Sequence, residues 1–170
     1  MAKTLVVVYS YTGTSRLAAD LLCAQRGWPL GVITDASPRR GSLRCIIDSL
    51  LRVRPDIRYE GPDPADFHTV VLVSPIWMQR LAGPMRSFVG IHAHRLPRVA
   101  VVSLMASKGA PNAVDEICRL INSVPVLACA FTAKEVNDGS LEARLEGFGR
   151  ALESAQAARP DLGQELAPAN

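Results

Sequence analysis

The stretch LVVVYSYTGTS, which runs from Leu5 to Ser15, decides the fold of this 170-residue chain. It begins with an apolar run, 5–9, of the kind that forms a buried β-strand. A polar loop with one glycine follows, and over 15–26 the apolar residues recur with a helical period before Gly27 ends the pattern. A buried strand that passes through a short loop into an amphipathic helix is the first half of a β-α-β unit.

The same alternation recurs along the chain. Valine-rich apolar runs predict five strands, at 5–9, 30–34, 70–74, 99–103 and 124–130. Stretches of helical period predict five helices, at 15–26, 42–52, 84–90, 111–123 and 140–157. Most of the strand runs are continuously apolar, as expected of parallel strands that are covered on both faces.

These elements predict an α/β fold with a doubly wound sheet of five parallel strands in the order 2-1-3-4-5 and helices on both faces. In such a sheet the strand order reverses beside strand 1. The loops after strands 1, 3 and 4 then converge on one crevice at the carboxyl ends of the strands, where ligands of open α/β sheets bind. We therefore expect the functional residues in those three loops.

Length and composition favour one ordered domain. Hydrophobic residues make up 48% of the chain and charged residues 21%, which is enough apolar surface to form a core. We expect a single domain at 1–157. The last residues, 158–170, contain prolines, a glycine and no periodic apolar pattern, so they predict a flexible tail.

Charge and cysteine content exclude several classes of protein. No apolar run reaches the roughly 18 residues of a membrane span, and no signal peptide is visible, so a soluble cytoplasmic protein is expected. The net charge of +3 is spread over 19 basic and 16 acidic residues and predicts no nucleic-acid partner. The four cysteines include no CxxC pair and have no histidine at metal-ligand spacing, so no metal site is expected.

The loop after the first predicted strand has the composition of an anion site. Ser10, Thr12, Thr14 and Ser15 supply four hydroxyls at the start of a helix, where unpaired amides and the positive end of the dipole attract phosphate. Gly13 permits a backbone turn that directs successive amides at a ligand. Helix capping alone explains one or two of the hydroxyls, so we favour a bound phosphate. Neither the lysine motif of nucleoside triphosphate sites nor the GxGxxG of dinucleotide sites is present.

This loop resembles the FMN phosphate loop of flavodoxins. A second stretch, 74–77 followed by 82–88, is similar to the loop after strand 3 in flavodoxin-like proteins and FMN-dependent reductases. A third, 103–109, occupies the place of their second flavin-flanking loop. The resemblance spans about residues 3–155 and implies the flavodoxin-like fold with FMN as cofactor. It implies the following cofactor-binding residues: Ser10, Tyr11, Thr12, Gly13, Thr14, Ser15, Pro75, Ile76, Trp77, Met78, Ser103, Met105, Ser107, Lys108 and Gly109.

Trp77 is expected to stack on the isoalloxazine ring, because an aromatic face suits a flat and partly apolar ring; packing on the protein itself is the alternative. Ser107, Lys108 and Gly109 are expected to bring amides or a cation close to flavin N1 and O2, although Lys108 is equally compatible with a solvated position. Flavodoxins often place a tyrosine in this third loop, and none occurs here. The second flavin face is therefore open to a small molecule or a partner, or partly covered by Met105.

The resemblance implies a redox protein that transfers electrons from NAD(P)H or a partner reductase to a small acceptor such as a quinone. Flavodoxins that act as carriers are usually strongly acidic, so the mildly basic charge favours an FMN-dependent oxidoreductase. No catalytic residue is expected, because the flavin performs the chemistry itself. The alternative functions are a one-electron carrier flavodoxin and a non-catalytic flavin-binding module. A homodimer is a possible assembly for each of these functions.

Two other classes share this architecture and are excluded by the first loop. Phosphorylation receivers need acidic residues at the ends of strands 1 and 3, where Ser10 and Ser74 stand. Low-molecular-weight phosphatases need a cysteine nucleophile in the first loop, and the nearest cysteine, Cys23, lies well inside the first predicted helix.

Overall fold

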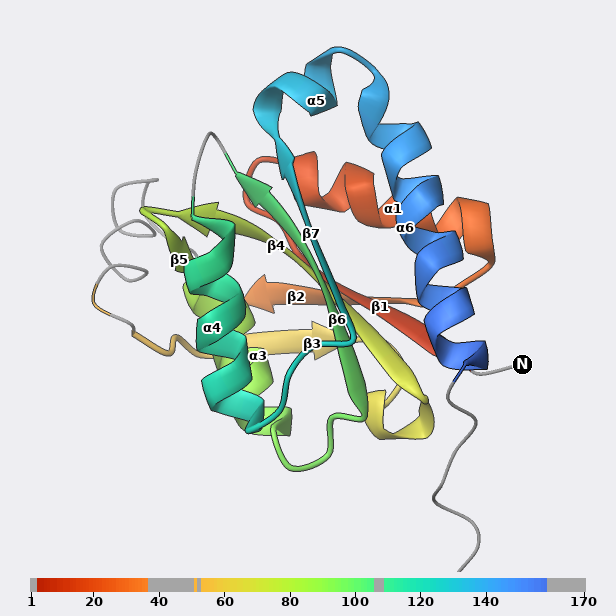
Figure 1. The fold of residues 1–170 in the computed structure, drawn as a ribbon. Helices are drawn as coiled ribbons and strands as arrows, with labels where there is room; N and C mark the ends of the chain where they lie inside the picture. Colours follow the sequence, from red (N-terminus) through yellow and green to blue (C-terminus); the bar gives the residue numbers. More distant parts are fainter. Residues whose placement is uncertain (1–2, 37–50, 52, 106–108, 159–170) are drawn as a thin grey trace, which may run out of the picture.

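The computed structural model describes residues 3–36, 51, 53–105 and 109–158. The predicted helix at 42–52, apart from Leu51, and the predicted tail beyond Ala158 lie outside the described residues. So do two of the predicted site residues, Ser107 and Lys108. The described residues form a sheet with helices on both sides (Figure 1).

The sheet confirms the predicted order of the parallel strands. Its order is β3-β2-β1-β4-β6-β7, with β5 paired to β4. β2, β1, β4, β6 and β7 are parallel neighbours, which is the arrangement 2-1-3-4-5. The strands are β1 (Thr4–Tyr9), β2 (Leu30–Asp35), β3 (Ile57–Glu60), β4 (Thr69–Trp77), β5 (Arg80–Leu81), β6 (Arg98–Met105) and β7 (Leu127–Thr132).

The predicted count of five strands is wrong, because the described residues form seven strands. The two additional strands are short and antiparallel. β3 extends the sheet beyond β2, where Val32 pairs with Glu60, and its residues alternate between half-buried and exposed. Four alternating residues at a sheet edge form no continuous apolar run, so the pattern that predicts buried strands does not detect them.

The last predicted strand, 124–130, is displaced from the observed β7. Val124 is 78% exposed in the connection that precedes the strand. The next residue, Pro125, has no amide to donate, and the contact to β6 begins where Val126 N donates to Val99 O at 2.8 Å. The apolar run predicts the existence of the strand but not the residue at which its pairing begins.

Two pairs of long helices cover the two faces of the sheet (Figure 1). α1 (Thr14–Arg26) and α6 (Ser140–Ala157) pack on one face, and α3 (Gly83–His92) and α4 (Ala110–Ile121) pack on the other. Within β1, Val6 and Val8 belong to the core beneath α1 and α6, and Val7 belongs to the core beneath α3 and α4. Both faces are thus buried, which explains the continuously apolar strands.

Short helices complete the described structure. They are η1 (Pro64–Asp66), which precedes β4, and α5 (Ala133–Asn137), which follows β7. Within the described ranges, every helix is too short or too polar to cross a membrane.

Two glycines of α6, Gly147 and Gly149, differ in the space beside them. A Cβ at Gly147 would meet nothing within 4 Å, whereas a Cβ at Gly149 would lie 2.4 Å from Arg26 Nε. That guanidinium donates to Glu146 O at 2.7 Å and to a carboxylate oxygen of Glu153 at 3.3 Å. Gly149 therefore leaves room for a hydrogen-bonded side chain between the helices.

We expect Gly147→Ala to raise the free energy of unfolding by about 0.5–1 kcal/mol, because alanine is the better helix former. Gly149→Ala is expected to lower it, since Arg26 must then leave two acceptors, each contributing about 1 kcal/mol. Urea denaturation of both variants measures the difference. Equal stabilisation by the two substitutions would show that the α1–α6 contact accommodates the added methyl group.

Candidate functional site

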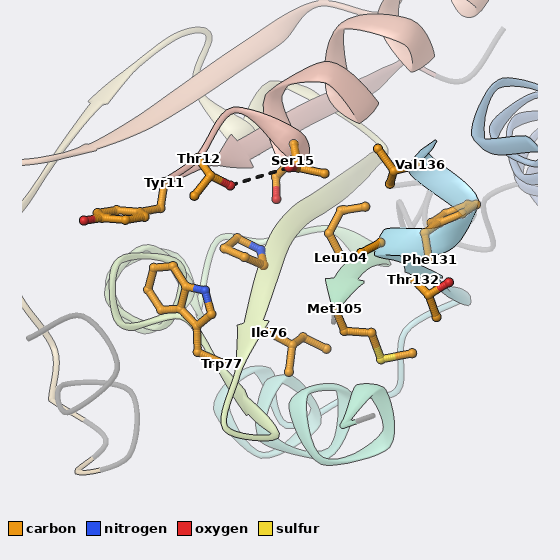
Figure 2. Close-up of a pocket in the computed structure, with 13 residues that line it drawn as sticks. Tyr11, Thr12, Ser15, Ile76, Trp77, Leu104, Met105, Phe131, Thr132 and Val136 are labelled. Carbon is orange, nitrogen blue, oxygen red and sulfur yellow. Dashed lines mark hydrogen bonds between the residues drawn. The ribbon is translucent and has the colours of Figure 1, made fainter. Parts of the chain in front are cut away.

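A pocket of about 220 Å³ opens at the carboxyl ends of β1, β4, β6 and β7, the edge at which the sequence predicts a ligand (Figure 2). Four segments that are distant in sequence form its walls. The lining residues are Tyr11, Thr12, Thr14, Ser15, Pro75, Ile76, Trp77, Leu104, Met105, Phe131, Thr132, Ala133 and Val136.

The pocket brings together more than half of the predicted site residues. Those that line it are Tyr11, Thr12, Thr14, Ser15, Pro75, Ile76, Trp77 and Met105. Five other predicted residues in the described part of the chain do not: Ser10, Gly13, Met78, Ser103 and Gly109. Met78 is 62% exposed and Ser103 is buried in β6, while Gly109 precedes α4 as its N-cap.

Ser10 and Gly13 shape the first loop without lining the pocket. Gly13 has a φ of 94°, in the left-handed region, and is the N-cap of α1. Its amide donates to Ser10 Oγ at 3.1 Å. A Cβ at this position would meet nothing within 4 Å, so the backbone conformation, and not a lack of space, requires glycine here.

The first turn of α1 has unused hydrogen-bonding capacity. No side chain in the described ranges caps this helix end, and the first intrahelical bond runs from Leu17 N to Gly13 O. The amides of the three residues between them therefore have no acceptor within the helix. The hydroxyls of Thr12 and Thr14 lie 3.5 Å apart beside these amides. Amides, hydroxyls and the helix dipole together suit an anion.

Trp77 is the last residue of β4 and does not belong to a loop. The sequence predicts a strand that ends at 74, whereas β4 continues through Trp77. The reason is that Ile76 and Trp77 pair with the antiparallel strand β5, which returns directly after a two-residue turn. Trp77 is therefore held by sheet pairing.

The ring of Trp77 contacts two tyrosines. Its centroid lies 6.2 Å from that of Tyr9 and 5.6 Å from that of Tyr11, both in edge-to-face geometry. Tyr9 in turn donates its hydroxyl to an Asp35 carboxylate oxygen at 3.3 Å. Figure 2 shows Tyr11 and Trp77 together at one end of the pocket. Trp77 thus packs on the protein and lines the pocket at once, and its stacking on a flavin stays a prediction.

The wall opposite these aromatic residues was not predicted from the sequence. It consists of Phe131 and Thr132 from β7 with Ala133 and Val136 from α5 (Figure 2). The sequence signal that was available is the capping box TAKE, 132–135, a helix-start motif. The sequence predicts a strand that ends at 130, whereas β7 continues to Thr132, the residue that begins this motif.

A network of polar contacts holds that wall. Glu135 accepts hydrogen bonds from the amide and the hydroxyl of Thr132, at 2.7 and 2.8 Å. Arg144 of α6 forms an ion pair with Glu135 and lies over the Phe131 ring, 4.6 Å from its centroid. Because α5 has only five residues, these contacts and not its own helical bonds determine its place.

Among the described residues, the side chains that line the pocket are uncharged, so the feature there that suits an anion is the α1 terminus. Arg16, in the first turn, binds Asp20 at 2.8 Å instead. Burial, with the charge of Asp20 added, raises the pKa of the Cys23 thiol in α1 to about 11, which keeps that thiol protonated at neutral pH. Among the described residues, no group of three or more His, Cys, Asp or Glu could hold a metal ion.

Solved flavoproteins share this architecture. A flavoprotein from Lactobacillus acidophilus NCFM in complex with FMN superposes with a TM-score of 0.68 at 17% identity, over 82% of this chain and 99% of that one. A protein from Bacteroides eggerthii DSM 20697, provisionally described as a flavoprotein, gives a TM-score of 0.70 at 19% identity, over 94% and 100%. A flavodoxin from Streptococcus pneumoniae TIGR4 gives 0.54 at 16% identity, over 90% and 99%.

No family model and no curated protein matches the sequence. At identities below 20%, the structural likeness establishes the fold. This chain has the flavodoxin-like α/β fold, as the resemblance of its loops implies.

Proposed function

We propose that this protein binds FMN in the pocket and transfers electrons through it. One observation carries the proposal: an uncapped helix terminus rich in hydroxyls and a tryptophan ring line the same pocket at the carboxyl edge of the sheet. The first suits a phosphate and the second a flat aromatic ring. FMN contains both groups, and the Lactobacillus flavoprotein of the same fold was solved in complex with FMN.

The residues present fit FMN in chemistry as well as in position. The loop carries hydroxyls and free amides for a phosphate, and the space beside Gly13 is open. Leu104, Met105 and Phe131 present apolar surface to the rest of the ligand. Bound FMN would supply hydride or electron transfer. The chain's own residues would hold the phosphate, support one ring face and exclude water.

For the finer function, we propose that electrons come from NAD(P)H or a partner reductase and pass to a small acceptor such as a quinone. The mildly basic net charge of +3 supports this over a carrier that is steered by strong negative charge. A one-electron carrier and a non-catalytic flavin-binding module remain the competing functions.

The test begins with the absorbance spectrum of the protein after purification and after addition of FMN. A yellow protein that NADPH or NADH bleaches without oxygen, and that a quinone restores, would support the reductase. Reduction by a flavoprotein reductase alone would support the carrier. Bound FMN that is reduced neither by NAD(P)H nor by a flavoprotein reductase would support the non-catalytic module. Failure to bind FMN would contradict the whole proposal.

Removal of the ring of Trp77 should weaken FMN binding. We expect Trp77→Ala to raise the dissociation constant about fivefold, because an aromatic stack contributes on the order of 1 kcal/mol. Trp77→Phe should retain most of the affinity. Titration of the apoprotein with FMN, followed by flavin fluorescence, measures both. An unchanged affinity in the alanine variant would assign Trp77 to protein packing alone.

A further inference from the structure

We infer that Gln79 and Asn112 are positioning residues that hold Trp77 in place against the bound flavin. The inference rests on the proposed FMN site and adds to it a contact between a segment that lines the pocket and one that does not. These segments are the β4–β5 hairpin, residues 75–81, and the first turn of α4.

The hairpin turn that follows Trp77 is strained. Met78 and Gln79 have φ values of 48° and 61°, and they connect β4 to β5 between the paired residues Trp77 and Arg80. Two-residue turns with both φ values positive favour asparagine and glycine, since larger side chains crowd the backbone in this region. A strained turn of this kind persists only where the surrounding structure holds it.

The start of α4 holds the turn through Gln79. A Cβ at Gly109, whose φ is 118°, would lie 2.5 Å from Gln79 Cα, so the two backbones are in direct contact. Asn112 Nδ2 also donates to Gln79 Oε1 at 3.3 Å. Both contacts are made to the same residue, two positions after Trp77.

The β5 strand of the hairpin is held by a side chain of α3. Arg86 Nη2 donates to Leu81 O at 2.8 Å, and Leu81 is buried. Met78, at the tip, is 62% exposed. Between the buried base and the exposed tip, the contacts of Gln79 hold the turn that follows Trp77. They act on the Trp77 backbone together with its pairing to β5, while the ring itself contacts Tyr9 and Tyr11.

The position of Trp77 affects the two redox states of a flavin differently. Reduction places electron density on the isoalloxazine ring, so a neighbouring aromatic face stabilises oxidised and reduced forms to different extents. A looser Trp77 should therefore change the ratio of the two affinities, which sets the shift of the midpoint potential of bound FMN relative to free FMN. A residue that served stability alone would leave this ratio unchanged.

The test uses Asn112→Ala and Gln79→Gly in a Trp28→Phe background, so that Trp77 is the single tryptophan. Alanine favours the helix and glycine relieves the turn, so neither variant is expected to lower the unfolding temperature. We expect a lower fluorescence anisotropy of Trp77 in the apoprotein. In the FMN-loaded protein, we expect the ratio of the affinities for oxidised and reduced FMN to change about threefold.

Two further variants serve as controls for this experiment. The exchanged pair Gln79→Asn/Asn112→Gln retains both amides and should restore anisotropy and potential. Val124→Ala truncates a 78% exposed side chain at the other end of the sheet and should change neither. If Trp77 anisotropy stays at the parent value in both single variants, the inference is wrong. If the parent protein fails to bind FMN, the proposed function is wrong, while the anisotropy of the apoprotein still decides the positioning role.

Discussion

Thr12→Glu is expected to abolish FMN binding while the chain stays folded. Thr12 is exposed and lines the pocket beside the α1 terminus, so the protein accommodates a longer side chain there. Its carboxylate would face the phosphate. Two charges about 4 Å apart at a protein surface repel by about 4 kcal/mol, so we expect the FMN affinity to fall at least 100-fold. Fluorescence titration with FMN, together with circular dichroism, measures binding and folding.

Two controls separate charge at the site from charge in general. Thr12→Ser retains the hydroxyl and should bind FMN with nearly the parent affinity. Ser123→Glu adds the same charge after α4, at the opposite end of the sheet, and should not affect binding. A Thr12→Glu protein that folds and keeps its flavin would remove the first loop from the phosphate site.

Arg86→Met is expected to have the largest effect on stability. Arg86 of α3 and Glu116 of α4 form an ion pair with side chains only 3% and 8% exposed, and Arg86 also donates to Val53 O and Leu81 O. Its removal leaves a buried carboxylate without a partner. Breaking one half of such a pair costs about 3–5 kcal/mol, which is a large part of the stability of a typical domain. Urea denaturation measures the loss.

The loss of unfolding free energy in Arg86→Met should come from the unpaired charge of Glu116 and not from lost side-chain volume. The double variant Arg86→Met/Glu116→Gln should therefore regain a large part of the stability, in a coupled and non-additive way. Arg150→Met breaks an exposed ion pair with Glu146 on α6 and should cost less than about 1 kcal/mol. Equal losses from Arg86→Met and Arg150→Met would show that the buried pair contributes no more than the exposed one.

The parallel sheet was predictable because its strands are covered on both faces. The residues of β1 alternate between the two helix-covered cores, so the whole strand is apolar and stands out in the sequence. The two short antiparallel strands, β3 and β5, lack this signal. β3 is covered unevenly, and β5 has only two residues, so the pairing of each depends on its neighbours in space and not on its own composition.

The two walls of the pocket also differ in how far the sequence predicts them. Its first wall follows from a local rule, because hydroxyls and a glycine that precede a helix expose the helix amides wherever the motif stands in a chain. For the wall of Phe131, Thr132 and Val136, the capping box at 132–135 indicates a helix start but not where that helix lies. Its placement depends on Arg144 of α6, which holds Glu135 and covers the Phe131 ring.

The sequence by itself determined the parallel strand order, the flavodoxin-like fold and the hydroxyl-rich loop at the start of α1. Each follows from residues that are close together in the chain, through hydrophobic period, helix capping and backbone freedom. Only the tertiary structure decided that Trp77 ends a strand instead of lying in a loop, that Gln79 rests on Gly109, and that α5 closes the pocket. The pairing of Trp77 with Arg80 spans only three residues, but it depends on a turn that the contact of Gln79 with Gly109 supports. The contacts of Gln79 and of α5 join separate segments, and their energies exist only after the fold has brought those segments together.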